Sequence, residues 1–331
     1  MKPTDHKPRA EASKRAMTRA QFLRLAARAA GAGAAAGVLG PVAAAFAAGP
    51  AANGKPVLQR PVSSSGQMLP VIGVGTAVVY DLDPADAKFP LLVETLRTFL
   101  AHGGAVIDTA PSYGRAEKSL GEIFRRGGGR ERAFLATKVA AGSEQAAMDS
   151  VAASLRDLGT DRIDLLQVHN IRNMAVNLGT IRRLQEAGKV RYAGITTSFR
   201  NTYDEYERIM RREKLDFIQI DYALDNREAE ERILPLARER GMAVLINLPF
   251  GRGRLFAKAR GRALPPWAAD IDCTSWAQFF LKFVLANPAV TVIIPGTDKP
   301  EYALDNLNAA RGRIPDAAMR GQMLRYWDQI A

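Results

Sequence analysis

Residues that bind transition metals or form cross-links are scarce in this chain. Its 331 residues include one cysteine, Cys273, and three histidines. A single cysteine excludes an intrachain disulfide and any metal site built from several thiolates. A metal-dependent barrel hydrolase needs several histidine and carboxylate ligands at its strand ends, and the sequence does not supply them. We therefore expect no metal.

Long apolar runs are missing as well. No run of 18 or more strongly apolar residues occurs beyond the N-terminal segment, so we expect no stable membrane span. The net charge of +12 is uneven, because residues 1–50 carry eight Lys/Arg against two acids. The remaining excess is spread along the chain on probable helix faces, which favours a solvated surface over a nucleic-acid interface.

Residues 1–48 have the pattern of a signal peptide: a charged segment, a mildly apolar Ala/Gly-rich stretch and small residues around Ala45-Phe46-Ala47. Within this leader, Thr18, Arg19, Phe22, Leu23 and Arg24 resemble a twin-arginine export signal, with Ala20 in place of the second arginine. We expect a periplasmic protein if the leader is functional and a cytoplasmic one otherwise. Residues 49–60 are predicted to be a linker, and 61–331 one domain.

From residue 61 onward, short apolar runs alternate with amphipathic stretches. The apolar runs are 71–75, 105–107, 133–137, 163–168, 191–195, 217–220, 243–247 and 290–294. The amphipathic stretches are 91–101, 117–126, 148–158, 180–187, 203–212, 228–240 and 275–286. Eight strands alternating with helices indicate parallel βαβ units, and eight strands can close a barrel. The predicted fold is an α/β (β/α)8 TIM barrel. An open doubly wound sheet is disfavoured because no Gly-x-Gly-x-x-Gly follows the first strand.

Three segments lie outside this alternation. Residues 62–68 are predicted to form a hairpin around Ser65-Gly66 that plugs the N-terminal face of the barrel. Residues 315–330 are predicted to form an extra C-terminal helix. The segment 249–271 is expected to be a long loop without structure of its own, of the kind that serves as a lid or binding loop.

Four side chains lie at or just beyond the C-terminal ends of the predicted strands: Asp108, Tyr113, Lys138 and His169. Parallel-barrel enzymes gather their catalytic groups at the C-terminal ends of several strands. An aspartate, a tyrosine, a lysine and a neutral histidine are the groups that proton delivery to a reacting carbonyl requires.

With these residues in place, the chain resembles the aldo-keto reductases from about residue 61 to 331. The motifs that carry the resemblance are Gly73-Val74-Gly75-Thr76, Ile107-Asp108-Thr109-Ala110 through Tyr113-Gly114, Thr137-Lys138, Val168-His169, residues 190–195, Gln219, Pro249 with Gly251, and Ile294-Pro295-Gly296-Thr297. The resemblance implies that Asp108, Tyr113, Lys138 and His169 are catalytic.

Each of these four roles has a physical basis. A tyrosine has a pKa near 10, too high for an efficient acid at neutral pH, and a neighbouring ammonium is expected to lower it. Lys138 would act in this way on Tyr113, and Asp108 would hold Lys138 charged and in place. His169 would donate a hydrogen bond to the substrate carbonyl and fix its angle.

Hydride chemistry needs a cofactor, because no side chain carries a hydride. The resemblance implies that NADP(H), favoured over NAD(H), lies across the barrel mouth with its carboxamide on Thr196, Thr197 and Gln219. Lys299 is the cation that remains near the expected 2′-phosphate, since Tyr302 stands where the family often has an arginine. The full predicted cofactor set is Gly75, Thr76, Asp108, Thr196, Thr197, Gln219, Asn247, Pro249, Phe250, Gly251, Gly296, Thr297, Lys299, Asp305 and Asn306.

The predicted substrate pocket is lined by Tyr80, Tyr113, His169, Phe199 and Trp267, with Phe250 and Leu255 beside them. This lining suits small aldehydes or ketones, so the implied function is NAD(P)H-dependent reduction of a carbonyl to an alcohol by a monomer or small homo-oligomer. The alternative is a cofactor-binding, slow-turnover regulatory barrel like the channel-associated members of the family. Departures at residues 197, 247 and 302 favour that alternative, and the intact four catalytic residues argue against it.

Overall fold

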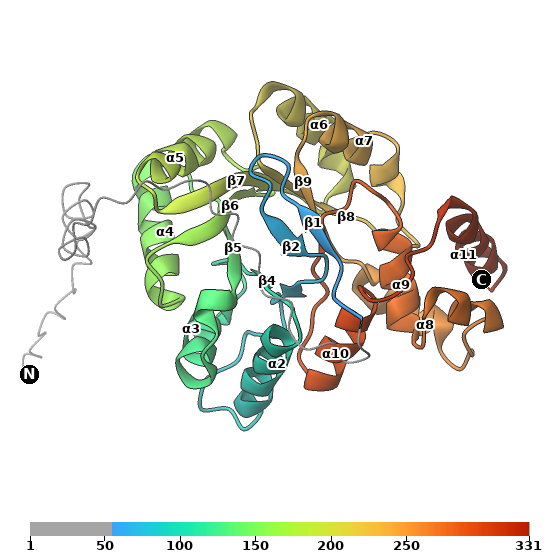
Figure 1. Cartoon of the computed structure of the whole chain (residues 1–331). Coiled ribbons are helices and arrows are strands. Elements are labelled where there is room, and N and C mark those ends of the chain that lie inside the picture. Colours follow the sequence, from blue (N-terminus) through green and yellow to red (C-terminus); the bar gives the residue numbers. More distant parts are fainter. Residues whose placement is uncertain (1–54, 331) are drawn as a thin grey trace, which may run out of the picture. The chain divides into compact units, whose positions relative to one another are not determined.

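The computed structural model describes residues 55–330 (Figure 1). The predicted leader and the first half of the predicted linker lie outside the described residues. In the described part, no helix is both long and apolar enough to span a membrane.

Eight parallel strands form one sheet whose spatial order follows the chain order. They are β3 (Val74–Gly75), β4 (Val106–Asp108), β5 (Phe134–Val139), β6 (Ile163–His169), β7 (Val190–Thr196), β8 (Phe217–Asp221), β9 (Ala243–Asn247) and β10 (Val292–Ile293). Parallel bridges from Ile72 to Ile293 and from Gly75 to Gly296 join the first and last strands. The predicted TIM barrel is confirmed.

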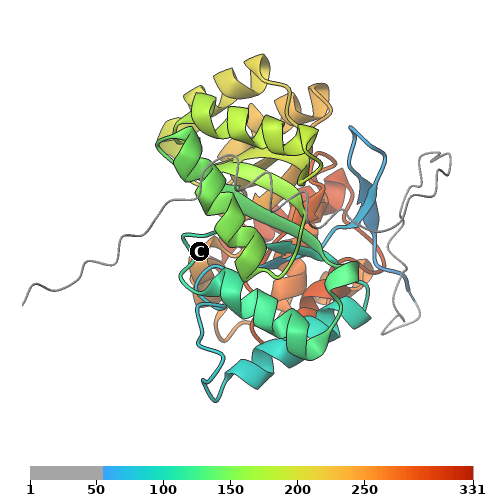
Figure 2. The same ribbon diagram turned by 90° about the vertical axis from the view of Figure 1, so that its left-hand side faces the viewer.

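Helices surround the strands (Figures 1 and 2). They are α2 (Phe89–Ala101), α3 (Ala116–Gly127), α4 (Glu144–Asp157), α5 (Met174–Glu186), α6 (Tyr203–Arg212), α7 (Ile233–Glu239), α8 (Arg254–Ala259), α9 (Trp276–Leu285), α10 (Pro300–Asn308) and α11 (Ala317–Gln329). In α6, for example, Tyr206 and Met210 are fully buried while the arginines near its C-terminal end stay in solvent. Ser143 and Ser275 begin α4 and α9 as N-caps that accept backbone N–H bonds.

A two-stranded hairpin closes the N-terminal end of the barrel, as predicted. Its strands β1 (Gln59–Pro61) and β2 (Met68–Pro70) are antiparallel. Val62 and Leu69 are fully buried in a cluster with residues from the N-terminal ends of the barrel strands, Phe134 among them. The hairpin begins before the predicted domain boundary at residue 61. Arg60 holds the first strand of the hairpin to the barrel, because its guanidinium donates to the backbone carbonyls of Leu285, Asn287 and Val290.

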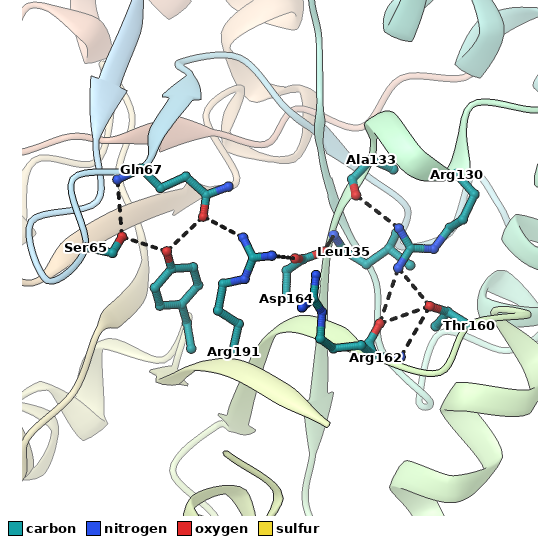
Figure 3. Close-up of polar contacts among 10 residues, drawn as sticks. Ser65, Gln67, Arg130, Ala133, Leu135, Thr160, Arg162, Asp164 and Arg191 are labelled. Atoms are coloured by element: carbon teal, nitrogen blue, oxygen red, sulfur yellow. Dashed lines mark hydrogen bonds and ion pairs between the residues drawn. The ribbon is translucent and has the colours of Figure 1, made fainter. Parts of the chain in front are cut away.

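A polar network fastens this hairpin to the barrel (Figure 3). The Tyr192 hydroxyl on β7 donates to Gln67 Oε1 at 2.8 Å and accepts from Ser65 Oγ at 2.6 Å. Arg191 also donates to Gln67 Oε1, at 2.9 Å, and lies 3.7 Å from Asp164 on β6. Because Gln67 and Tyr192 are buried, each bond replaces one that water would otherwise make.

The segment after β9 differs from the prediction. Residues 249–271 contain two 3-10 turns, Gly251–Gly253 and Pro266–Ile271, and the helix α8 between them. The extra C-terminal helix is confirmed as α11, which buries Met323 and Trp327. Trp327 packs edge-on against Phe280 of α9 with ring centroids 5.3 Å apart. Within the segment 249–271, Phe256 packs against Phe280 and Trp267 packs against Phe279. These contacts give the segment a structure that its Gly, Pro and Arg content concealed.

Removing the hydroxyl that holds the hairpin should weaken the fold and leave the opposite end of the barrel unchanged. We expect Tyr192→Phe to lower the free energy of unfolding by about 1 kcal/mol, the usual net value of a hydrogen bond. Denaturant unfolding followed by circular dichroism measures this. A change below about 0.3 kcal/mol would show that the Tyr192–Gln67 bond does not hold the hairpin.

Candidate active site

The register of the strands brings the predicted catalytic residues to one rim of the barrel. Asp108 ends β4, His169 ends β6, and Lys138 is the last residue but one of β5. Lys138 pairs across the sheet with Gln167, two residues before His169. Tyr113 lies beyond β4 in a turn whose backbone N–H bonds the carbonyl of Ala110 at 3.0 Å. All four therefore gather at the C-terminal ends of neighbouring strands.

At the centre of this rim is a buried ion pair. Lys138 Nζ lies 2.7 Å from Asp108 Oδ2 and also donates to the carbonyl of Thr109 at 2.7 Å. The two side chains are only 1% and 3% exposed. Burial alone would lower the pKa of Lys138, but the charge of Asp108 and the Tyr113 hydroxyl outweigh it and leave the pKa raised. Lys138 therefore remains an ammonium ion.

Tyr113 lies against this ammonium. Lys138 Nζ is 4.9 Å from the centre of the Tyr113 ring. Burial raises the pKa of Tyr113 more than Lys138 lowers it, and Asp108 raises it further. The expected net lowering is therefore wrong: Lys138 acts in the predicted direction, but desolvation is larger. Tyr113 keeps its proton at neutral pH.

His169 faces the same tyrosine. The two rings are nearly perpendicular, with centroids 6.0 Å apart. Burial, with the positive charges of Lys138 and Arg172, lowers the pKa of His169 to about 4. The imidazole is therefore neutral at physiological pH, as predicted, and has one N–H to donate.

The predicted carboxamide-binding residues lie on the adjoining strands. Thr196 ends β7 and pairs with both His169 and Gln219, so that these residues share one level of the barrel. Thr196, Thr197 and Gln219 are buried, and Gln219 Oε1 accepts a hydrogen bond from Gln167, which also reaches Asp108. The structure thus joins the predicted cofactor residue Gln219 to the buried ion pair through Gln167.

The residues predicted for the adenine half gather around the start of α10. Thr297 Oγ1 donates to the carbonyl of Pro295 and accepts from Asn306 Nδ2 at 3.1 Å. Asp305 accepts bonds from Ser275 and Gln278, the first residues of α9. Lys299 is the N-cap residue of α10, with its ammonium 5.0 Å from the centre of the Tyr302 ring. Asn306 and Asp305 therefore fix the local backbone, and Lys299 is the cation at this helix start.

The predicted pocket residues are more scattered. Tyr80 and Leu255 are fully buried, whereas Phe199 is 49% exposed. Trp267 packs against Phe279 of α9 and Tyr326 of α11, with centroids 5.8 Å apart in both cases. Only Tyr113 and His169 of the predicted lining are in ring contact with each other. The pocket roles of the others stay predictions.

A hollow of about 660 Å³ opens between the loops that follow β7, β8 and β9. Phe199, Asp225 and Arg252 line it, one from each loop. Leu248 and Arg252 in the last of these loops adopt positive φ angles of 51° and 55°. So does Val78 in the loop after β3, at 71°, where a branched side chain is unfavourable. Such strain tends to cluster at functional sites, and here it marks the same rim as the catalytic residues.

The sequence analysis missed one residue of this site, Gln167. It is fully buried in β6, and its Nε2 donates to Gln219 Oε1 at 2.8 Å and reaches Asp108 Oδ1 at 3.4 Å. A signal was available, because Gln167 is a polar residue among the apolar Leu165, Leu166 and Val168 and lies two positions before His169. Residues two apart in a strand share a face.

The ionisation of His169 can be tested directly. We expect its imidazole resonances to titrate near pH 4 and to stay unchanged from pH 5.5 to 8, with His169→Asn used to assign them. The unfolded chain takes up this proton near pH 6.5, so the contribution of His169 to folding stability should fall as pH drops from about 6.5 to about 4. A midpoint above pH 6 would contradict the neutral imidazole.

Comparison with known proteins agrees with this geometry. The sequence model of the Aldo/keto reductase family matches residues 71–321. Aldo-keto reductase str7 of Strobilurus tenacellus is 26% identical over 255 residues, 65% of this chain and 75% of that protein. Methylglyoxal reductase YeaE of Escherichia coli is 31% identical over 244 residues, 71% of this chain and 84% of that protein.

Solved structures give the same result. An aldo/keto reductase from Klebsiella pneumoniae, crystallised with NADP and acetate, superposes with a TM-score of 0.66 at 25% identity. The match covers 79% of this chain and 93% of that one. With the family match over most of the barrel, these likenesses establish that the chain belongs to the aldo/keto reductase family of oxidoreductases.

Proposed function

We propose that this protein reduces an aldehyde or ketone to an alcohol with NADP(H), using Tyr113 as the proton donor. The observation that carries the proposal is the buried Lys138–Asp108 pair, which holds a charged ammonium against a protonated tyrosine. A salt bridge with only structural value is often no better than apolar packing. The position of the Lys138–Asp108 pair beside Tyr113 and the neutral His169 supports a chemical role for this pair.

The side chains divide the proton chemistry among them. The neutral His169 donates its N–H to the substrate carbonyl oxygen and orients it. When bound, a reduced nicotinamide supplies hydride to the carbonyl carbon. Tyr113 gives its hydroxyl proton to the oxygen as negative charge develops there, and Lys138 stabilises the resulting phenolate. Asp108 keeps Lys138 charged throughout.

The residues present fit a dinucleotide. Thr109 Oγ1 and Asn247 Oδ1 are buried, lie beside the rim and have no hydrogen-bond partner in the part of the chain that the structure describes, as expected for groups that bond a ligand. A Cβ at Gly296 would meet nothing within 4 Å, so the backbone there is open to close approach. The nearby N-terminus of α10 suits a phosphate. The Klebsiella relative was crystallised with NADP, which supports the same cofactor here.

Replacing the proposed acid should abolish turnover and spare cofactor binding. We expect Tyr113→Phe to slow reduction of 4-nitrobenzaldehyde by about 10²- to 10⁴-fold, the usual contribution of general acid catalysis. Loss of NADPH absorbance at 340 nm measures the rate, and quenching of protein fluorescence measures NADPH affinity. Tyr192→Phe, at the opposite end of the barrel, is the control and should react as the wild type does.

Two outcomes would count against this proposal. If Tyr113→Phe reduced 4-nitrobenzaldehyde at the wild-type rate, Tyr113 would not be the proton donor. No turnover by the wild type across a panel of aldehydes, despite tight NADPH binding, would favour the slow regulatory barrel. The departures from the family pattern at Thr197, Asn247 and Tyr302 make that panel worthwhile.

The preference for NADP(H) depends on Lys299. We expect Lys299→Ala to weaken NADPH binding about tenfold or more, since a charge-assisted hydrogen bond contributes about 1.5–3 kcal/mol, and to leave NADH binding nearly unchanged. Titration calorimetry with both dinucleotides measures the difference. Equal losses for the two cofactors would exclude Lys299 from recognition of the 2′-phosphate.

A further inference from the structure

A buried amide links the two halves of the proposed site. Gln167 has no exposed surface, and its side chain lies in the barrel between Asp108 of the ion pair and Gln219 of the proposed carboxamide site. Gln167 thus joins Asp108 and Gln219 in a chain of three side chains. None of the four proposed catalytic roles accounts for Gln167.

Chemistry fixes which way the Gln167 amide points. A carboxylate only accepts hydrogen bonds, so Gln167 must turn an N–H group toward Asp108. One N–H of Gln167 then meets Asp108 Oδ1, and the other meets Gln219 Oε1. Turning the Gln167 amide over would place its oxygen against two acceptors.

The unpaired oxygen of Gln167 shows that the orientation of its side-chain amide is strongly fixed. Gln167 Oε1 is buried and has no hydrogen-bond partner among residues 55–330. Leaving a buried acceptor unpaired costs about 1–3 kcal/mol. An amide with a purely structural role would be expected to have both of its ends satisfied. Here the donor end is fully used and the acceptor end is not.

The intervening strand is shaped to let Gln167 reach across. On β7, between β6 and β8, Gly194 pairs with Gln167. A Cβ at Gly194 would lie 3.2 Å from Gln167 Cγ and 2.9 Å from the carbonyl of Phe217. The glycine therefore leaves room for the Gln167 side chain to cross this strand to Gln219.

We propose that Gln167 is a positioning residue that fixes the amide orientation of Gln219, and through it the way Gln219 presents itself to the nicotinamide carboxamide. This inference rests on the proposed function, because it takes Gln219 as a cofactor contact. Gln167 itself touches neither cofactor nor substrate. It acts by holding Gln219 Oε1, while the shared carboxylate of Asp108 ties this orientation to the catalytic ion pair.

A double-mutant cycle on NADP⁺ affinity tests this proposal without relying on turnover. The variants are Gln167→Met, Gln219→Met and the double variant, since methionine matches glutamine in length and lacks the amide. We expect Gln219→Met to weaken binding about tenfold, the value of one hydrogen bond, and Gln167→Met about three- to tenfold. The double variant should bind within about twofold of Gln219→Met, because coupled residues do not act additively.

The outcomes separate this inference from the cofactor site itself. Unchanged affinity in Gln219→Met would refute the proposed cofactor contact. If Gln219→Met binds NADP⁺ more weakly but Gln167→Met binds it as the wild type does, the role of Gln167 is refuted and the cofactor contact of Gln219 stands. The same holds if the losses of affinity in the two single variants add up in the double variant. Gln185→Met is the matched control. Gln185 is a half-buried residue on α5 whose amide donates to the carbonyl of Arg191, at the end of the barrel that the hairpin closes. This variant should bind NADP⁺ as the wild type does.

A second variant tests the proposal if Gln167→Met does not fold. Gln167→Glu keeps the size of the side chain but cannot donate when ionised. We expect it to bind NADP⁺ at least threefold more weakly than the wild type at pH 8, and to regain affinity at lower pH as the new carboxyl group takes up a proton. Wild-type affinity at pH 8 would also overturn the proposal.

Discussion

The ion pair between Lys138 and Asp108 is the interaction on which the site depends. The two charges are 2.7 Å apart and almost wholly out of water. Such a buried pair is stable only because each charge neutralises the other and both groups make further hydrogen bonds. The barrel makes this possible, since neighbouring parallel strands end at one rim. Removing either charge would leave the other buried without its partner.

Burial affects the ionisable groups of this rim in different ways. It keeps His169 neutral and keeps the proton on Tyr113, which are the forms that a hydrogen-bond donor and a proton donor require. Lys138 stays charged, because the Asp108 carboxylate compensates its desolvation. In the mechanism that we propose, Lys138 therefore matters less for making Tyr113 acidic in the resting protein than for stabilising the phenolate once the proton has left.

Much of this structure could be predicted from the sequence, and the residues show why. The eight strands are short apolar runs whose burial follows from composition, so each was located to within a few residues. The meeting of the four proposed catalytic residues at one rim could be predicted because strand ends converge in a barrel. Gln167 was missed because its role depends on Gly194 and on Gln219 two strands away, which the local pattern does not show. Helix α8 and the burial of Tyr80 depend on long-range packing in the same way.

The most direct test of the account follows the hydride itself. The wild-type protein is incubated with 4-nitrobenzaldehyde and NADPH carrying deuterium at the reactive C4 position, and the alcohol is examined by NMR and mass spectrometry. The account predicts one deuterium on the former carbonyl carbon, and no such product with Tyr113→Phe over the same time. Alcohol without deuterium, or labelled alcohol formed equally fast by Tyr113→Phe, would contradict it.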